Sequence, residues 1–306
     1  MPVADEVGQL QRSQGPEGEL FRQVAEQGHY AGRTRPTNTR QGIYALTADG
    51  QFLASVNTRS GDEALAMLER ALAAWRALPR EERAPGGAPS QPERRFRSLY
   101  PHDGLVLEVL SRDLPREDAP DDWRAAASNR DWAWFRREEV LGLLPDELTP
   151  GAEQAWPGGL VRRLARLHLV DNVRGQVRAF AQEDVEQAEL TTVVRAVQAG
   201  RVEVELSGRV RLRARGSWAV DGYRDMDRPG EQERGLELTL LGRGTFDRAK
   251  ERFSAFELVA AGERWGGSQY NARGDDLAPT PIGFVLRRAA GTTRVEPASF
   301  WEYGWR

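Results

Sequence analysis

Apolar and polar residues alternate along residues 189–215, with turn residues between the runs. Val202, Val204 and Leu206 are separated by glutamates, and arginines separate the apolar residues of 209–215. A period of two predicts antiparallel strands with one buried face. Turns are expected at 198–200 and at Ser207-Gly208, so this stretch predicts a three-stranded meander.

The same pattern predicts which charges lie on the outer face of this meander. A three-residue loop at 207–209 keeps the apolar residues of both strands on one side, because directly opposed side chains share a face. This register pairs Glu205 with Arg211 and Glu203 with Arg213. Such pairs fix the register and add only about 0–1 kcal/mol of stability when they are exposed.

Further apolar runs predict more strands in the C-terminal part of the chain, at 104–110, 235–241, 254–260 and 282–286. Short helices are expected near 138–144 and 160–170. An antiparallel sheet of this size usually curls into a barrel or folds into a sandwich. The predicted fold class is therefore α+β, with a larger C-terminal antiparallel β-barrel or sandwich accompanied by helices.

The N-terminal part predicts a smaller unit. After a short helix at 19–27, two β-rich runs flank Asp49-Gly50, a strong hairpin signal within 42–57. A helix is then expected over 62–78, where Ala64, Leu65, Leu68, Leu72 and Trp75 recur at helical spacing until Pro79. We expect Leu68 and Leu72 to be buried against the hairpin.

This small unit resembles the second half of a thioredoxin-like domain over about residues 34–78. Pro36-Thr37, the hairpin and the following amphipathic helix carry the resemblance. The family implies a cis bond between Arg35 and Pro36. The sequence departs from the family because it has no Cys-x-x-Cys motif and too little chain before Pro36 for the first half of the fold. The resemblance therefore implies a redox-silent, truncated unit.

Residues 80–95 are rich in Pro, Gly and charged residues and show no periodicity, as is typical of a linker. The sequence thus predicts a small α/β unit at 1–79, a linker at 80–95, and helices plus an antiparallel β domain at 96–306.

Composition narrows the classes of function. The chain has no cysteine, which excludes thiol nucleophiles, thiolate metal sites and disulfides. Lys250 is the only lysine, which indicates a GC-rich genome rather than a phosphate-binding surface. The net charge of −3, with acids and bases mixed along the chain, argues against nucleic-acid binding. No run approaches the roughly 20 apolar residues of a membrane helix, so no membrane insertion is expected.

The first residues show neither a basic nor an apolar leader region. We therefore expect a cytoplasmic protein if the chain is complete, and an extracytoplasmic one if a leader has been removed.

Metal chemistry would depend on histidine and carboxylate ligands. Only three histidines occur, and both His102-Asp103 and His168 with Asp171 are candidates to hold a divalent metal. His168 also lies on the apolar face of its predicted helix, which favours a hydrogen-bonded core histidine.

Two polar loops are the candidate binding site. The residues singled out are Trp265, Tyr270, Asn271 and Arg273 in one loop, and Asp171, Asn172 and Arg174 in the other. Large polar and aromatic loop residues often carry function. The alternative is that their side chains hold the backbone turns by hydrogen bonds.

Three hypotheses of function remain. The leading one is a non-catalytic binding or interaction protein, with a protein or small-molecule partner and no cofactor, using the C-terminal sheet and the loop 265–273. The second is a metal-assisted hydrolase using His168, Asp171 and nearby carboxylates. The third is a degenerate thioredoxin-like protein that makes protein–protein contacts.

Overall fold

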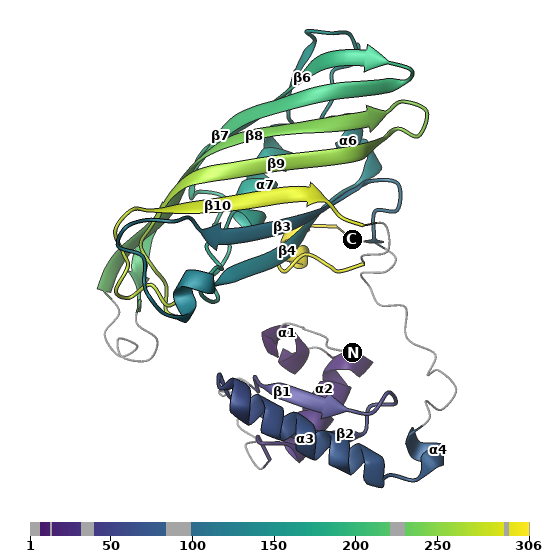
Figure 1. Cartoon of the computed structure of the whole chain (residues 1–306), viewed down its shortest axis with the longest axis vertical. Helices are drawn as coiled ribbons and strands as arrows, with labels where there is room; N and C mark the ends of the chain where they lie inside the picture. Colours follow the sequence, from purple (N-terminus) through teal and green to yellow (C-terminus); the bar gives the residue numbers. More distant parts are fainter. Residues whose placement is uncertain are drawn as a thin grey trace. The chain divides into compact units, whose positions relative to one another are not determined.

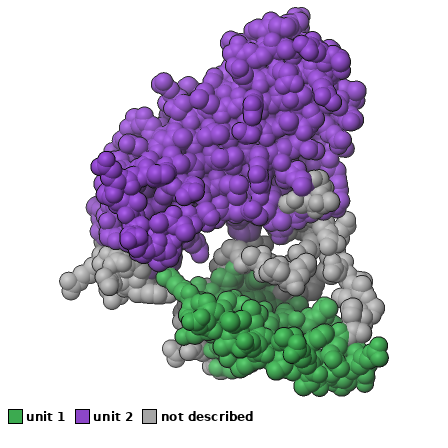
Figure 2. Space-filling model, in the orientation of Figure 1, with its two compact units in different colours: residues 1–93 green, residues 94–306 purple. Residues whose placement is uncertain are grey.

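The computed structural model describes residues 7–12, 14–31, 40–83, 99–220, 230–290 and 294–305. The chain divides into two compact units, unit 1 (Met1–Glu93) and unit 2 (Arg94–Arg306), which are coloured separately in Figure 2. The segment expected as a linker, 80–95, begins with the short helix α4 (Arg80–Arg83), and the rest of that segment lies outside the described residues.

Unit 1 combines a two-stranded hairpin with helices (Figure 1). Besides α4, its described elements are α1 (Val7–Arg12), α2 (Pro16–Gln27), β1 (Ile43–Leu46), β2 (Phe52–Val56) and α3 (Gly61–Ala77). The antiparallel hairpin predicted within 42–57 is confirmed. Gly50 in its turn has a φ of 93°, a conformation that glycine adopts without steric cost.

Helix α3 is confirmed as an element, but the prediction of which face it buries is wrong. Ser60 caps its start, since the Ser60 Oγ accepts a hydrogen bond from the backbone N–H of Glu63 at 3.3 Å. Leu68 and Leu72 are 51% and 44% exposed, whereas Met67 is buried. Two apolar stripes run along this helix with the same spacing, and the hairpin takes the one made of smaller side chains.

The thioredoxin-like resemblance is only partly covered by the described residues. Pro36-Thr37 and the implied cis bond at Arg35-Pro36 lie outside them. Hairpin and helix follow each other as expected over 43–77. The part of unit 1 that the structure describes contains two strands, so the resemblance stays a prediction.

Unit 2 is built on one eight-stranded antiparallel sheet with the strand order β4-β3-β10-β9-β8-β7-β6-β5. The sheet is open, because β4 and β5 are its two edges. The prediction of a closed barrel or a two-sheet sandwich is therefore wrong, although the mixed α+β class with an antiparallel sheet is confirmed. Helix α7 (Gly158–His168) covers the apolar face of this sheet, so no second sheet is needed to shield that face from water. Its strands are β3 (Leu105–Asp113), β4 (Ser128–Phe135), β5 (Glu153–Ala155), β6 (Val185–Gln198), β7 (Arg201–Trp218), β8 (Gly230–Asp247), β9 (Arg252–Trp265) and β10 (Thr280–Arg288).

The turn expected at Ser207-Gly208 does not exist, because β7 runs unbroken through these residues. The predicted alternation is nevertheless correct, since Val204 and Leu212 are buried and face the same side. Gly208 serves close packing instead of a turn: a Cβ there would lie 2.1 Å from the Glu189 carbonyl oxygen. The turn at Ala199-Gly200, where both residues have positive φ, is confirmed.

Because the strand continues, the predicted pairing of Glu205 with Arg211 is wrong. Glu205 stands opposite Val193 and Arg243, and it forms an ion pair with Arg195 at 2.7 Å. Arg211 instead binds Glu186 at 3.0 Å. These charges do lie on the exposed face of the sheet, as the alternation predicts.

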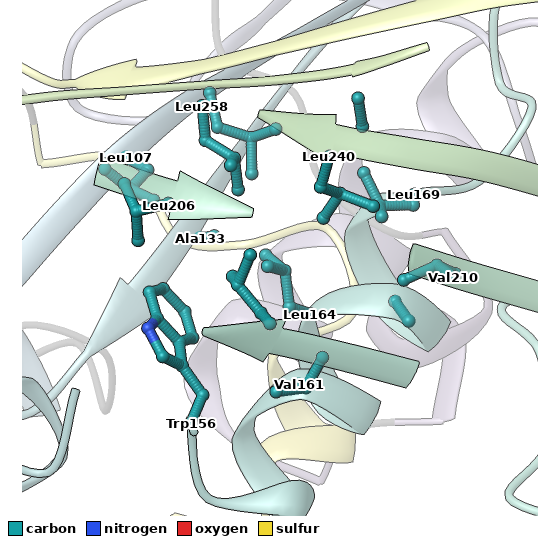
Figure 3. Close-up of a cluster of buried hydrophobic side chains, with 14 of the residues drawn as sticks. Leu107, Ala133, Trp156, Val161, Leu164, Leu169, Leu206, Val210, Leu240 and Leu258 are labelled. Carbon is teal, nitrogen blue, oxygen red and sulfur yellow. The ribbon is translucent and has the colours of Figure 1, made fainter. Parts of the chain in front are cut away.

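The core of unit 2 lies between the sheet and helix α7 (Gly158–His168). Figure 3 shows Val161 and Leu164 of this helix among Leu206, Leu240 and Leu258 of the central strands. Other short helices among the described residues of this unit are η1 (Trp123–Ala126), α6 (Arg137–Leu141) and η2 (Phe300–Tyr303). One face of the sheet is thus covered by apolar side chains, and the opposite face, called the outer face below, carries the charges.

Among the described helices, none combines the length and the apolar character that crossing a lipid bilayer requires.

Candidate functional site

The two loops predicted as a binding site meet in a buried network of arginines and aspartates, called the Arg273 network below. Arg273 is fully buried at its centre. Its Nε and Nη2 donate to the two carboxylate oxygens of Asp171 at 2.9 and 2.8 Å. Its Nη1 and Nη2 donate to Asp113 at 2.9 and 2.7 Å. Further ion pairs extend the network to Arg116, Arg174, Arg264 and Asp276.

The electrostatics of this network favour the ionised forms of its acids. Burial acts to raise the pKa of Asp113, but hydrogen bonds and charge from Arg273 and Arg174 hold this pKa below its usual value. The pKa of Asp276 is lowered in the same way, against burial, by Arg264, Arg116 and Arg174. Paired, hydrogen-bonded charges of this kind resist separation, so the network fastens the loop 266–279 to the sheet and to the segment after α7.

The other predicted residues also make internal contacts. Trp265 lies against Gly235, where a Cβ would come within 2.2 Å of the indole ring. The Asn271 Oδ1 accepts from the Ser268 backbone N–H at 2.9 Å, and the Asn172 Oδ1 accepts from a backbone N–H at 2.8 Å. Tyr270 differs, because its side chain is 41% exposed. The geometry therefore favours the structural alternative, in which these side chains hold the loops together.

His168 belongs to a second buried cluster. Its Nδ1 lies 2.7 Å from Asp131 Oδ2, and its Nε2 lies 2.6 Å from the Tyr303 hydroxyl. The Tyr303 oxygen accepts from the Trp134 backbone N–H at 3.1 Å, so this hydroxyl links His168 to β4. Burial raises the pKa of Tyr303 above its usual value. These contacts fasten η2 to α7 and β4.

The metal hypothesis gains no support from these contacts. His168 and Asp171 belong to separate networks, and each uses both its side-chain polar atoms there. Within the part of the chain that the structure describes, no three His, Asp or Glu side chains gather in a way that could hold a metal ion.

The outer face of the sheet offers the more accessible candidate site. Leu241, Val259, Val285 and Leu110 stand in register across β8, β9, β10 and β3. The first three are 62%, 38% and 36% exposed. The adjoining row consists of Thr239, Ala261 and Gly283, and it ends at Arg112 of β3. These two rows form a continuous surface, called the apolar band below.

Charged residues border the apolar band. On one side, Arg243 faces Glu257 with 4.0 Å between their charged atoms, and Arg287 binds Glu108 at 2.7 Å. Next to Leu241, an open groove of about 390 Å³ is lined by residues that include Val193, Arg195, Glu205, Ser207, Leu241 and Arg243. The band therefore presents exposed apolar surface with a paired polar border on this side, whereas Glu237 stands opposite Glu263 on the other.

Sequence reasoning missed this band, although a signal was present. Leu240-Leu241, Leu258-Val259 and Phe284-Val285-Leu286 place apolar residues side by side. Adjacent apolar residues break the alternation expected of a strand with one wet face. The members Asp113 and Asp276 of the Arg273 network were also missed, and nothing local in the sequence marks them as partners of Arg273.

The chain matches no protein-family model, and neither the curated proteins nor the solved structures contain a significant match to it.

Proposed function

We propose that this chain is a non-catalytic interaction protein that binds a partner protein across the apolar band of unit 2. The observation that carries the proposal is the register of Leu241, Val259, Val285 and Leu110 across four neighbouring strands. Scattered exposed apolar residues are normal on a protein surface, but a contiguous patch with a polar border is typical of interaction sites.

The shape of the band favours an amphipathic helix as the bound segment. Neighbouring strands lie about 4.8 Å apart, so four in-register residues span roughly 14 Å across the sheet. A helix rises about 1.5 Å per residue, and roughly ten helical residues cover that distance. The small side chain of Ala261 leaves one flank of the band low, whereas the space above Gly283 is filled by Leu114, whose side chain would lie 2.9 Å from a Cβ there.

The buried clusters support a binding role over a catalytic one. The Arg273 side chain is fully buried and that of His168 is 1% exposed, so their polar groups hold the fold. The resemblance of residues 34–78 to a thioredoxin-like unit stays part of the proposal, without redox chemistry because the chain has no cysteine.

A display library of helical peptides, selected against the intact protein, tests this proposal. We expect binders with apolar residues at i, i+3 or i+4, and i+7. Leu241→Asp should weaken their binding at least about tenfold, which is about 1.4 kcal/mol. Because Leu241 is 62% exposed, this substitution should leave the fold intact.

Leu20→Asp is the matched control, since Leu20 is a leucine of unit 1 that is 42% exposed and lies outside the apolar band and α3. Binding that survives Leu20→Asp and fails with Leu241→Asp supports the apolar band as the site. Peptides whose affinity is unchanged by Leu241→Asp would contradict the proposal, and so would a library that yields no binding peptide.

A further inference from the structure

Helix α3 carries two parallel apolar stripes that differ in size and in environment. One stripe contains Ala64, Met67, Ala71, Ala74 and Leu78, which are buried or half-buried. The other contains Leu65, Leu68, Leu72 and Trp75, which are 57%, 51%, 44% and 37% exposed. The helix therefore packs its smaller side chains on the hairpin and leaves its larger ones more than a third exposed, whereas burial alone favours the reverse. Among these larger side chains, Trp75 also has the Arg83 guanidinium over its ring, 5.7 Å from the ring centre.

The spacing of the exposed stripe is that of a helix-pairing seam. Positions 65, 68, 72 and 75 follow the alternating steps of three and four that define a and d positions of a heptad. A helix that packs on a single globular core needs only one such stripe. We propose that this seam, called the α3 seam, binds the α3 seam of a second copy of this chain as an antiparallel helix pair.

The α3 seam is complementary to itself, which supports a second copy of the chain as its binding partner. In an antiparallel pair with its two-fold axis at residue 70, Leu65 meets Trp75 of the other copy and Leu68 meets Leu72. All four seam residues of each chain are then matched. A two-fold interface of this kind uses the same patch on both subunits, which is the commonest arrangement among homo-oligomers.

The charges beside the seam select the antiparallel direction. Asp62, Glu69 and Arg76 are spaced seven apart and lie along one flank. Antiparallel pairing sets Asp62 of each copy near Arg76 of the other, and it also opposes the two helix dipoles favourably. Parallel pairing would instead set this charged flank against the opposite flank of the other copy, which holds Ala64 and Ala71, so Asp62 would gain no opposite charge. Glu69 is the exception in the antiparallel pair, since it meets its own copy near the axis.

The association is expected to be weak, because the α3 seam is short. Four side chains per copy bury less than the roughly 800 Å² per partner of a standard interface. A dissociation constant in the range of tens of micromolar is therefore expected, on the order of −6 kcal/mol. Concentration then controls the state of the full-length chain.

Sedimentation velocity of the full-length protein from about 1 to 200 μM tests the proposal. The mass should rise from the 34.2 kDa of one chain towards twice that value. Leu68→Ser combined with Leu72→Ser should weaken association at least tenfold, without loss of helix content, because both residues are exposed in the single chain. Leu141→Ser on unit 2 is the control and should leave association unchanged, because Leu141 is 39% exposed and lies outside both the α3 seam and the apolar band.

Charge exchange gives a second, independent readout. Arg76→Asp should weaken association several-fold, and adding Asp62→Arg should restore it, because each residue faces the other across the two-fold axis. Glu69→Gln should tighten the pair by removing the one like-charge contact. A chain that is monomeric at 200 μM, an association lost with Leu141→Ser instead, or a double charge variant as weak as Arg76→Asp would each overturn the proposal.

Discussion

The Arg273 network of unit 2 and helix α3 of unit 1 place their side chains in opposite environments. In the network, charged residues that resemble a surface site are buried and hold three segments together. In α3, large apolar residues that resemble core are exposed. The chemical type of a side chain alone therefore does not tell whether it is part of the core or of an accessible surface. The residues that pack around each side chain decide this.

The largest effect that tests this comparison is expected at Arg273. Arg273→Leu leaves Asp171 and Asp113 without their shared cation inside the protein, and breaking a buried ion pair costs about 3–5 kcal/mol. Denaturant unfolding of full-length protein measures this loss in unit 2. Arg243→Leu is the control, because the Arg243 side chain is 80% exposed, and it should change stability by at most about 0.5 kcal/mol.

The next largest change in stability is expected from two adjacent residues of α3. Met67→Ala should lower the free energy of unfolding of unit 1 by about 2–5 kcal/mol, because Met67 is fully buried. Leu68→Ala, one residue further, should cost about 0.5 kcal/mol or less, because Leu68 is 51% exposed. Thermal unfolding at low protein concentration compares the two. Equal costs would show that the two stripes are not distinct.

Acidification probes the Arg273 network without a substitution at its centre. The pKa values of Asp113 and Asp276 are lowered in the folded protein, so their stabilisation is fully present above the unfolded pKa of about 3.9. It is lost as the pH falls through the lower, folded pKa values. Unfolding followed from pH 6 to pH 2 should show this loss, and Asp113→Asn should make its pH dependence shallower. An unchanged slope would mean that Asp113 is not ionised in the network.

The smallest effect is expected for charges on the outer face. Glu205→Gln removes the ion pair with Arg195, in which both side chains are more than half exposed. Water screens such pairs, so the free energy of unfolding should change by about 0–1 kcal/mol. A loss as large as that of Arg273→Leu would remove the distinction between buried and exposed charges in this protein.

Local patterns in the sequence predict the elements well and their environments less well. The hairpin with Asp49-Gly50 and the alternation around Val204 and Leu212 are local signals, and both are confirmed. The open sheet was missed because closure depends on whether β4 meets β5, which no local pattern reports. The Ser207-Gly208 turn was a local signal that close packing of strands outweighed.

For the candidate site too, the sequence indicates the residues but not their environment. Arg273, Asp171 and Arg174 were recognised as unusual, and they do come together. Whether they face solvent depends on Asp113 and Asp276. Asp113 belongs to the distant strand β3, and Asp276 belongs to the same loop as Arg273. In α3, two stripes of identical period differ only in what packs against them, so periodicity alone could not choose between Leu68 and Met67.

The pairing of β3 with β10 also determines when the sheet can form during synthesis of the chain. Asp113 and its strand partner Ile282 lie about 170 residues apart, a distance that a ribosome translating about 5–20 residues per second covers in roughly ten seconds or more. Throughout that interval the nascent β3–β4 hairpin has one edge with unsatisfied hydrogen-bonding groups. Such edges recruit other strands, so this chain is exposed to misassembly until β10 emerges, and its refolding in the test tube should be slow for its size.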